Sequence, residues 1–168
     1  MLKRLLICIL IMNSGIFAFG QVGERFFQAQ GLYSICPPYL WEIEALTGRP
    51  TTVFREPGQE FPTEIVIVYS IQPPRLTIEE GWRNFQLILS SDSSYRSIST
   101  VNFITDTGLN GIKHIYTRQG RDNILRCVLY MFIAPGGHSI NIECEALAQY
   151  EDKYDEILDE SVATLEIR

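Results

Sequence analysis

The sequence predicts an α+β domain built on a mostly antiparallel sheet, and three observations support this class. Several short apolar or alternating segments come before an amphipathic segment near residue 80. Four more strand-like segments follow it, separated by turn residues, and a second amphipathic segment closes the chain. Runs of strands broken by few helices are typical of α+β domains, whereas regular alternation of strands and helices indicates a parallel sheet.

Four strands are expected before the first helix, at residues 31–35, 41–45, 52–55 and 64–71. The first stops at Pro37 and Pro38, because proline cannot continue a strand ladder. The last reads EIVIVYSI and is apolar on both sides. We therefore expect Glu64–Ile71 to be a central strand that is covered on both faces.

The first helix is expected to begin after Thr77, because Thr77 and Glu80 have the spacing of a capping box. Apolar residues then recur at helical spacing, which gives one stripe for packing on a sheet: Ile78, Trp82, Phe85 and Leu89. This spacing makes Trp82 a core anchor rather than a ligand platform.

The second half of the chain is predicted to form two hairpins and a helix. Residues 95–118 form the first hairpin, whose turn holds Asp106-Thr107-Gly108 and Asn110-Gly111, and Asn-Gly is a strong hairpin signal. Ile124–Ile133 and Ser139–Cys144 flank a Pro-Gly-Gly turn and form the second. A helix from about Gln149 has an acidic face, which is read as solvated surface.

Residues 1–20 have the anatomy of a secretory signal peptide. Lys3 and Arg4 precede an apolar run, and Ala18-Phe19-Gly20 offers a small-residue cleavage site. The apolar run is shorter than the roughly 20 residues of a membrane span. We therefore expect a periplasmic or secreted protein whose residues 21–168 form a single domain without a transmembrane segment.

The charge of the domain excludes some partners. Removing residues 1–20 leaves 12 basic and 20 acidic residues, a net charge of −8. An acidic domain without a basic cluster is not expected to bind nucleic acid or anionic membrane surfaces. We expect a monomer whose partner is an unknown protein or envelope component.

No motif in the chain indicates catalysis. The nucleophile elbow G-x-S-x-G, the H-E-x-x-H zinc motif, the P-loop and G-x-G-x-x-G are all absent. Only His114 and His138 could pair with a cysteine thiol as a base, and nothing beside the cysteines lowers a thiol pKa. The sequence therefore predicts a non-enzyme, without catalytic residues, a cofactor or a metal site.

Cys127 and Cys144 are the candidate disulfide, since they flank the Pro-Gly-Gly turn on the second hairpin. Side-chain alternation is expected to place both on one apolar face and Glu143 and Glu145 on the other. A four-residue loop, residues 134–137, sets the cysteines directly opposite each other, close enough to bridge. A two-residue Gly-Gly turn sets them on a diagonal, which leaves two buried thiols. Both alternatives stay open at this point.

Several of these features together resemble the PsbP-like superfamily. The matching residues are Gly31–Ile35 followed by Pro37, Pro38 and Trp41, then the helix at Thr77, Gly108 and Gly111, and finally Ser161-Val162. The superfamily includes the PsbP subunit of photosystem II, a yeast Ran-binding protein and exported bacterial proteins. The resemblance implies a central antiparallel sheet flanked by helices on both faces, an α/β/α sandwich. It implies no functional residues, because a fold is not a function.

The expected function is that of an exported, non-catalytic binding or interaction module of the cell envelope. The alternative is a small-ligand carrier with a pocket between the sheet and one helix. A deep apolar cavity with a few convergent polar groups would favour the carrier. An exposed apolar patch would favour partner binding.

Overall fold

The computed structural model describes residues 22–45, 51–59, 61, 63–73 and 75–168. The expected signal peptide, residues 1–20, lies outside these described residues. The elements follow one another as β1 (Phe26–Phe27), β2 (Tyr33–Ile35), β3 (Glu42–Ala45), β4 (Thr51–Arg55), β5 (Glu64–Ile71), α2 (Ile78–Ser90), β6 (Arg96–Ile104), β7 (Asn110–Gln119), β8 (Ile124–Ala134), β9 (His138–Leu147), the 3-10 turn η1 (Ala148–Tyr150), α3 (Asp155–Ala163) and β10 (Glu166–Ile167).

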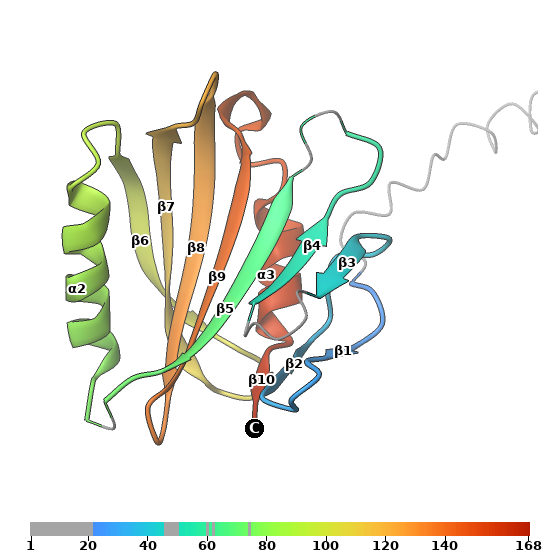
Figure 1. The fold of residues 1–168 in the computed structure, drawn as a ribbon, viewed down its shortest axis with the longest axis vertical. Helices are drawn as coiled ribbons and strands as arrows, with labels where there is room; N and C mark the ends of the chain where they lie inside the picture. Colours follow the sequence, from blue (N-terminus) through green and yellow to red (C-terminus); the bar gives the residue numbers. More distant parts are fainter. Residues whose placement is uncertain (1–21, 46–50, 60, 62, 74) are drawn as a thin grey trace, which may run out of the picture.

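The strands form two antiparallel sheets (Figure 1). The larger sheet has seven strands in the order β3-β4-β5-β9-β8-β7-β6, and the smaller one has three in the order β1-β2-β10. The predicted α+β class and antiparallel sheet are confirmed. Strands β1 and β10 were not predicted, because strands of two residues are too short for an alternating pattern.

The two faces of the larger sheet have different surroundings. One face carries Cys127, Leu129 and Met131, which cluster with Trp82 of α2, and we call it the α2 face. The other carries the larger apolar cluster, and we call it the core face. Its buried sheet residues are Phe54, Ile65, Ile67, Tyr69, Ile115, Val128, Tyr130, Phe132, Ile140, Ile142 and Cys144. Leu158 and Val162 of α3 belong to this second cluster.

Helix α2 covers only part of its face, because it contacts β7 and β8 and leaves the strands beyond β9 open. On β5, Val66 is half-buried and Val68 is 40% exposed. The expectation that Glu64–Ile71 is covered on both faces is therefore wrong for the α2 face. The resemblance also implied an α/β/α sandwich with helices over both faces. The structure does not show this arrangement, because the α2 face is only partly covered.

The capping box of α2 is confirmed. The Thr77 side chain accepts from the backbone N–H of Glu80 at 3.2 Å, and Glu80 accepts from the N–H of Thr77 at 3.2 Å. Trp82 is buried and packs on the sheet, as its spacing predicts. The cap and the apolar stripe together determine where α2 begins and which side faces the sheet.

Helix α3 begins at Asp155, six residues later than predicted, because residues 148–154 form a 3-10 turn and further turns. Within them Glu151 has a φ of 50°, which interrupts a right-handed helix. The acidic face of α3 is also more than solvated surface. Asp155 accepts two hydrogen bonds from Arg126 at 2.6 and 2.8 Å, and Asp159 accepts from Lys113 at 2.7 and 2.8 Å.

The turn between β6 and β7 follows one of its two predicted signals. It spans residues 105–109, with Gly108 at a φ of +82°, so the turn predicted at Asp106-Thr107-Gly108 is confirmed. Asn110 and Gly111 lie in β7, so the Asn-Gly turn signal was wrong. Gly111 is required for packing instead, since a Cβ there would lie 2.4 Å from the Phe132 ring.

The turn between β8 and β9 has three residues, a length that neither alternative for the cysteines considered. Ala134 pairs with His138, so Pro135, Gly136 and Gly137 form the loop. This odd length shifts the register by one residue, which moves a strand's side chains to the other face. Cys127 is opposite Glu145, and Cys144 is opposite Val128.

The two cysteines consequently lie on opposite faces of the sheet. Cys127 packs on the α2 face and Cys144 on the core face, and both are free thiols. The expectation that they share one apolar layer is wrong, and the structure does not form the candidate disulfide.

We expect iodoacetamide to modify Cys36, Cys127 and Cys144 completely in protein that is unfolded without reductant. In folded protein Cys127 and Cys144 should react slowly, because both are buried. Mass spectrometry of the peptides measures the labelling. Unfolded, unreduced protein in which Cys127 and Cys144 resist labelling together would contradict the free thiols.

We expect Gly137→Ala to destabilise the protein more than Gly58→Ala does. Both glycines have a positive φ, +82° and +78°, so each alanine is strained by about 1–2 kcal/mol. A Cβ at Gly137 would also lie 2.3 Å from the carbonyl oxygen of Gln72, whereas no atom of the described residues lies within 4 Å of a Cβ at Gly58. Overpacking of this kind costs about a further 1–3 kcal/mol. Urea unfolding of the two variants measures the difference, and equal losses would contradict the three-residue turn packed against Gln72.

Candidate functional site: the open part of the α2 face

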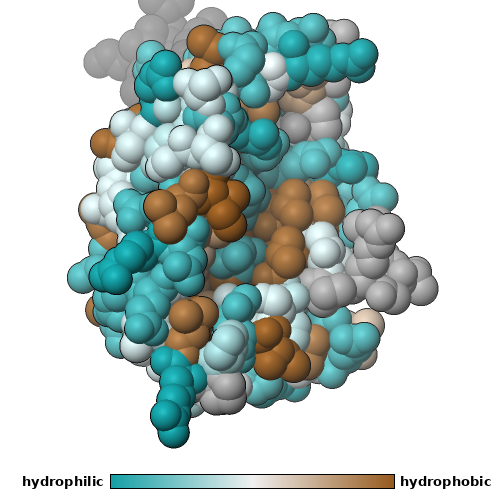
Figure 2. All heavy atoms as spheres, turned by 60° about the vertical axis from the view of Figure 1, so that its left-hand side comes forward, coloured by the Kyte–Doolittle hydropathy of each residue, from teal (hydrophilic) through white to brown (hydrophobic). Residues whose placement is uncertain are grey.

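Part of the α2 face has no helix over it, and we call this part the open sheet face. It consists of Ser139, Asn141, Glu143 and Glu145 of β9, Glu64, Val66, Val68 and Ser70 of β5, and Thr51, Val53 and Arg55 of β4. Figure 2 shows this side of the molecule as hollowed, with apolar side chains gathered in and beside the hollow. The sheet order produces the hollow, since the main contacts of α2 are with β7 and β8.

A cleft of about 190 Å³ separates α2 from the neighbouring strands. Helix residues Gly81, Asn84, Phe85 and Ile88 line one wall, and Met131, Ile133, Ser139 and Asn141 line the other, with Gln72 and Leu76 at one end. Gly81 allows the helix to come close, because a Cβ there would lie 2.7 Å from Ile133 Cδ1. Ile88 is 65% exposed, so apolar surface lies on both sides of the cleft.

A polar cluster lies at the other end of the open sheet face. Tyr116 donates a hydrogen bond to Glu143, and Arg118 forms an ion pair with Glu145. The Cys127 sulfur and one oxygen of each glutamate lie within 4.8 Å of one another. The expectation that both glutamates point away from both cysteines is therefore wrong for Cys127. The same one-residue register shift is the reason.

These three groups have the spacing of metal ligands, but the protein already supplies partners to both carboxylates. Burial raises the pKa of the Cys127 thiol to about 12, so this thiol is protonated at neutral pH. Burial also raises the pKa of Glu143, while its hydrogen bond from Tyr116 acts in the opposite direction. A protonated thiol is a poor nucleophile and a poor metal ligand.

The histidines do not assemble with a thiol. The ring nitrogens of His114 lie 2.8 Å from Tyr95 Oη and 2.8 Å from Thr100 Oγ1, and burial lowers its pKa. His138 Nδ1 lies 2.5 Å from Tyr69 Oη, at the end of β9 remote from Cys127. His114 is thus a hydrogen-bonded core residue, and the Cys–His pair considered from the sequence is not formed by these contacts.

The open sheet face is acidic. Glu42 and Glu44 of β3 continue it beyond β4, because they pair with Arg55 and Val53. Five carboxylates, Glu42, Glu44, Glu64, Glu143 and Glu145, thus stand against the two guanidinium groups of Arg55 and Arg118, a local charge of −3. Asn141 Oδ1 is buried and has no hydrogen-bond partner among the described residues.

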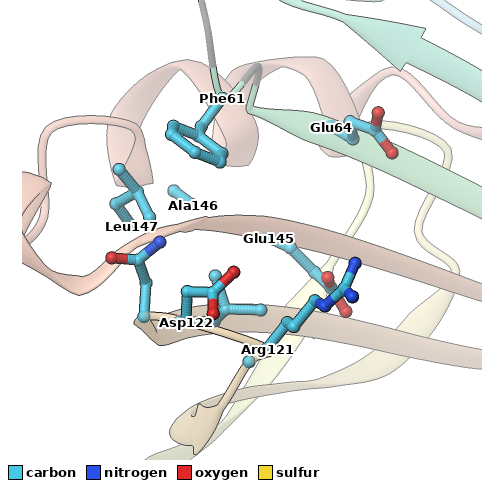
Figure 3. A pocket seen from close by; sticks show the side chains of 10 residues that line it. Phe61, Glu64, Arg121, Asp122, Glu145, Ala146 and Leu147 are labelled. Atoms are coloured by element: carbon cyan, nitrogen blue, oxygen red, sulfur yellow. The ribbon is translucent and has the colours of Figure 1, made fainter.

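A second hollow, the strand-end pocket, lies where β5, β8 and β9 meet the turn after β7. It has a volume of about 370 Å³ and is lined by Phe61, Glu64, Gly120, Arg121, Asp122, Asn123, Leu125, Glu145, Ala146 and Leu147. Figure 3 shows Phe61 over Ala146 and Leu147, with Arg121 and Asp122 on the opposite side. No residue of α2 or α3 is among its lining, so it is not the pocket between sheet and helix that the sequence suggested.

Comparison with known proteins connects the fold to solved structures. No protein-family model and no curated protein matches this sequence. Cyanobacterial PsbP (CyanoP) from Synechocystis sp. PCC 6803 superposes with a TM-score of 0.63 at 14% identity, over 94% of this chain and 99% of that chain. LpqN of Mycobacterium tuberculosis superposes with a TM-score of 0.68 at 10% identity, over 89% and 87%. The Ran-binding protein Mog1p of Saccharomyces cerevisiae gives 0.61 at 10% identity, over 88% and 96%.

The chain has the Mog1p/PsbP-like fold. The resemblance inferred from the sequence is thereby confirmed at the level of the fold. Identities of 10–14% show only that the folds are similar. No functional role is therefore assigned to a residue of this chain from the Mog1p/PsbP-like proteins. In the described part of the chain, no helix has both the length and the apolar character needed to cross a membrane.

We expect the stability of the wild type to decrease, relative to Glu143→Gln, as pH rises from about 4 to 7. The pKa of Glu143 is raised in the folded state, so above the unfolded value of about 4.3 the folded chain binds more protons. The free energy of unfolding then falls with pH until the raised pKa is passed. The glutamine variant lacks this titration. Urea unfolding at a series of pH values measures the difference, and parallel curves would contradict the burial of an ionising Glu143.

Proposed function

We propose that the protein is a non-catalytic interaction module of the cell envelope and that it binds its partner through the open sheet face. The observation that carries this proposal is the uncovered part of the α2 face, where exposed Val68 and Ile88 flank polar groups. An exposed apolar patch on a monomer marks an interaction site, because large contiguous apolar surface is normally covered. Covering by a partner is the function that this geometry supports best.

The chemistry of the site supports binding rather than catalysis. The carboxylates have partners in Tyr116 and Arg118, and the Cys127 thiol is protonated. The contacts of these groups stabilise the folded chain and leave no activated nucleophile beside a base.

The export expected from the sequence supports a location in the cell envelope. The anatomy of residues 1–20 predicts a signal peptide. The same fold occurs in LpqN, a protein involved in cell envelope biogenesis, and in CyanoP. On this basis we propose a periplasmic or secreted protein that acts as a monomer without a cofactor.

A small-ligand carrier is the second candidate, and the strand-end pocket favours it. Its volume of about 370 Å³ lies within the range of roughly 300–1,000 Å³ found for small-molecule sites. Leu125, Leu147 and Phe61 supply apolar lining, and Glu145 and Asp122 supply polar groups. The cleft beside α2, where the sequence placed this pocket, is smaller than that range at about 190 Å³.

We expect a photocrosslinker at Val68, but not at Val101, to capture a defined partner in the native host. Benzoylphenylalanine replaces each valine in turn, since both are exposed strand residues, at 40% and 52%. Val101 lies in β6 on the core face and provides the matched control. Mass spectrometry of the adducts identifies a protein or a small molecule.

Equal crosslinking from both positions would contradict binding at the open sheet face. A photocrosslinker placed at Arg121 or Asp122 that captures a small molecule, with no adduct from Val68, would favour the carrier. Turnover of generic ester, peptide or phosphate substrates that is lost in Cys127→Ser would overturn the non-catalytic proposal.

A further inference from the structure

We infer that the partner of the open sheet face is an extended peptide segment with cationic side chains toward one end and apolar side chains toward the other. This inference rests on the proposed function, because it names the class of partner for the same site. The shape of the site, its charge and the amide side chains of the cleft lead to it.

The shape of the site is elongated. Alternate residues of β9, from Ser139 to Leu147, face the open side and connect the two hollows. Ser139 and Asn141 line the cleft beside α2, and Glu145 and Leu147 line the strand-end pocket. At about 3.3 Å per residue this row is about 26 Å long. A compact molecule fills one hollow, whereas an extended chain of about eight residues spans both.

The negative charge of the site favours a ligand with cationic groups. Glu145 and Glu64 are neighbours across β9 and β5, and the next row pairs Glu143 with Val66. The following row pairs Asn141 with Val68. Rows two residues apart thus pass from two carboxylates, through a carboxylate and a valine, to an amide and a valine, along a face whose local charge is −3.

A complementary segment places lysine or arginine toward Glu64 and Glu145 and apolar side chains toward Val68 and Ile88. The side chains of an extended segment alternate in direction with a period of two, which matches the spacing of these rows. A cation beside Glu143 would also offset the cost of burying its carboxylate.

Amide side chains in the cleft favour a peptide backbone as the ligand. Asn141 lies in one wall of the cleft, and Asn84 of α2 lies in the other. A peptide offers both N–H and C=O groups to such side chains.

Charge argues against a second copy as the occupant. The chain carries a net charge of −6, so another copy would bring like charge to an acidic face. Nucleic acid is disfavoured for the same reason. A cationic segment of a different protein is the occupant that fits.

The test uses three fluorescein-labelled nine-residue peptides, each with four valines and a glycine followed by four lysines, four serines or four glutamates. Fluorescence anisotropy measures their binding to the chain without residues 1–20. The lysine peptide should bind at least about tenfold more tightly than the serine peptide, and the glutamate peptide should not bind. Binding should weaken with added salt, because exposed charges are screened.

Matched variants locate the binding. Val68→Lys should weaken the lysine peptide by at least about tenfold, since it removes apolar contact and adds a repelling charge. Val101→Lys adds the same charge on the core face of β6 and should change the affinity less than about twofold. Circular dichroism confirms that both variants are folded, and Val68→Ser replaces Val68→Lys if the lysine unfolds the chain.

The outcomes separate the inference from the proposed function. Equal weakening by both variants means non-specific electrostatic binding and overturns the inference, as does equal binding of the lysine and serine peptides. If Val68 crosslinks a partner in the host but no lysine peptide binds, only the partner class is wrong. If Val68 neither crosslinks nor affects peptide binding, the proposed function fails as well.

Discussion

The three-residue turn of Pro135, Gly136 and Gly137 is the constraint on which the rest of the structure depends. Two glycines at positive φ close the loop, and the Gly137 carbonyl accepts a hydrogen bond from Gln72 at 2.7 Å. This length pairs Ala134 with His138 and so decides which side chains of β9 face which way. Ile140, Ile142 and Cys144 enter the core face, and every polar residue between them is turned toward α2.

The two faces then stabilise the protein by different means. The core face is closed by apolar packing with Leu158 and Val162, and α3 is oriented by partly buried charge-assisted hydrogen bonds to Arg126 and Lys113. Paired charges of this kind orient an element more than they add stability, because desolvation offsets much of their attraction. On the α2 face, the main contacts of the helix are with two strands, and Val68 on the remaining strands stays exposed.

The candidate site follows from that asymmetry. Glu143 and Glu145 share a face with Cys127 only because the turn has an odd number of residues. Their partners, Tyr116 and Arg118, come from β7, two strands away in the sheet order. The row along β9 then joins the cleft beside α2 to the strand-end pocket, which gives the site its length. The function we propose therefore depends on register rather than on any local motif.

The sequence by itself determined the fold class, the capping box at Thr77, the core role of Trp82 and the strand content on both sides of α2. These features depend on residues close together in the chain, through helical spacing, alternation and capping chemistry. Three-residue loops are common in hairpins, so Pro-Gly-Gly is compatible with the observed register, but the sequence did not select it from the other turn lengths. Only the tertiary structure decided that register, the uncovered part of the α2 face and the contacts of Asp155 and Asp159. Each of these depends on contacts between distant segments, and a shift of one residue reverses every side chain of a strand.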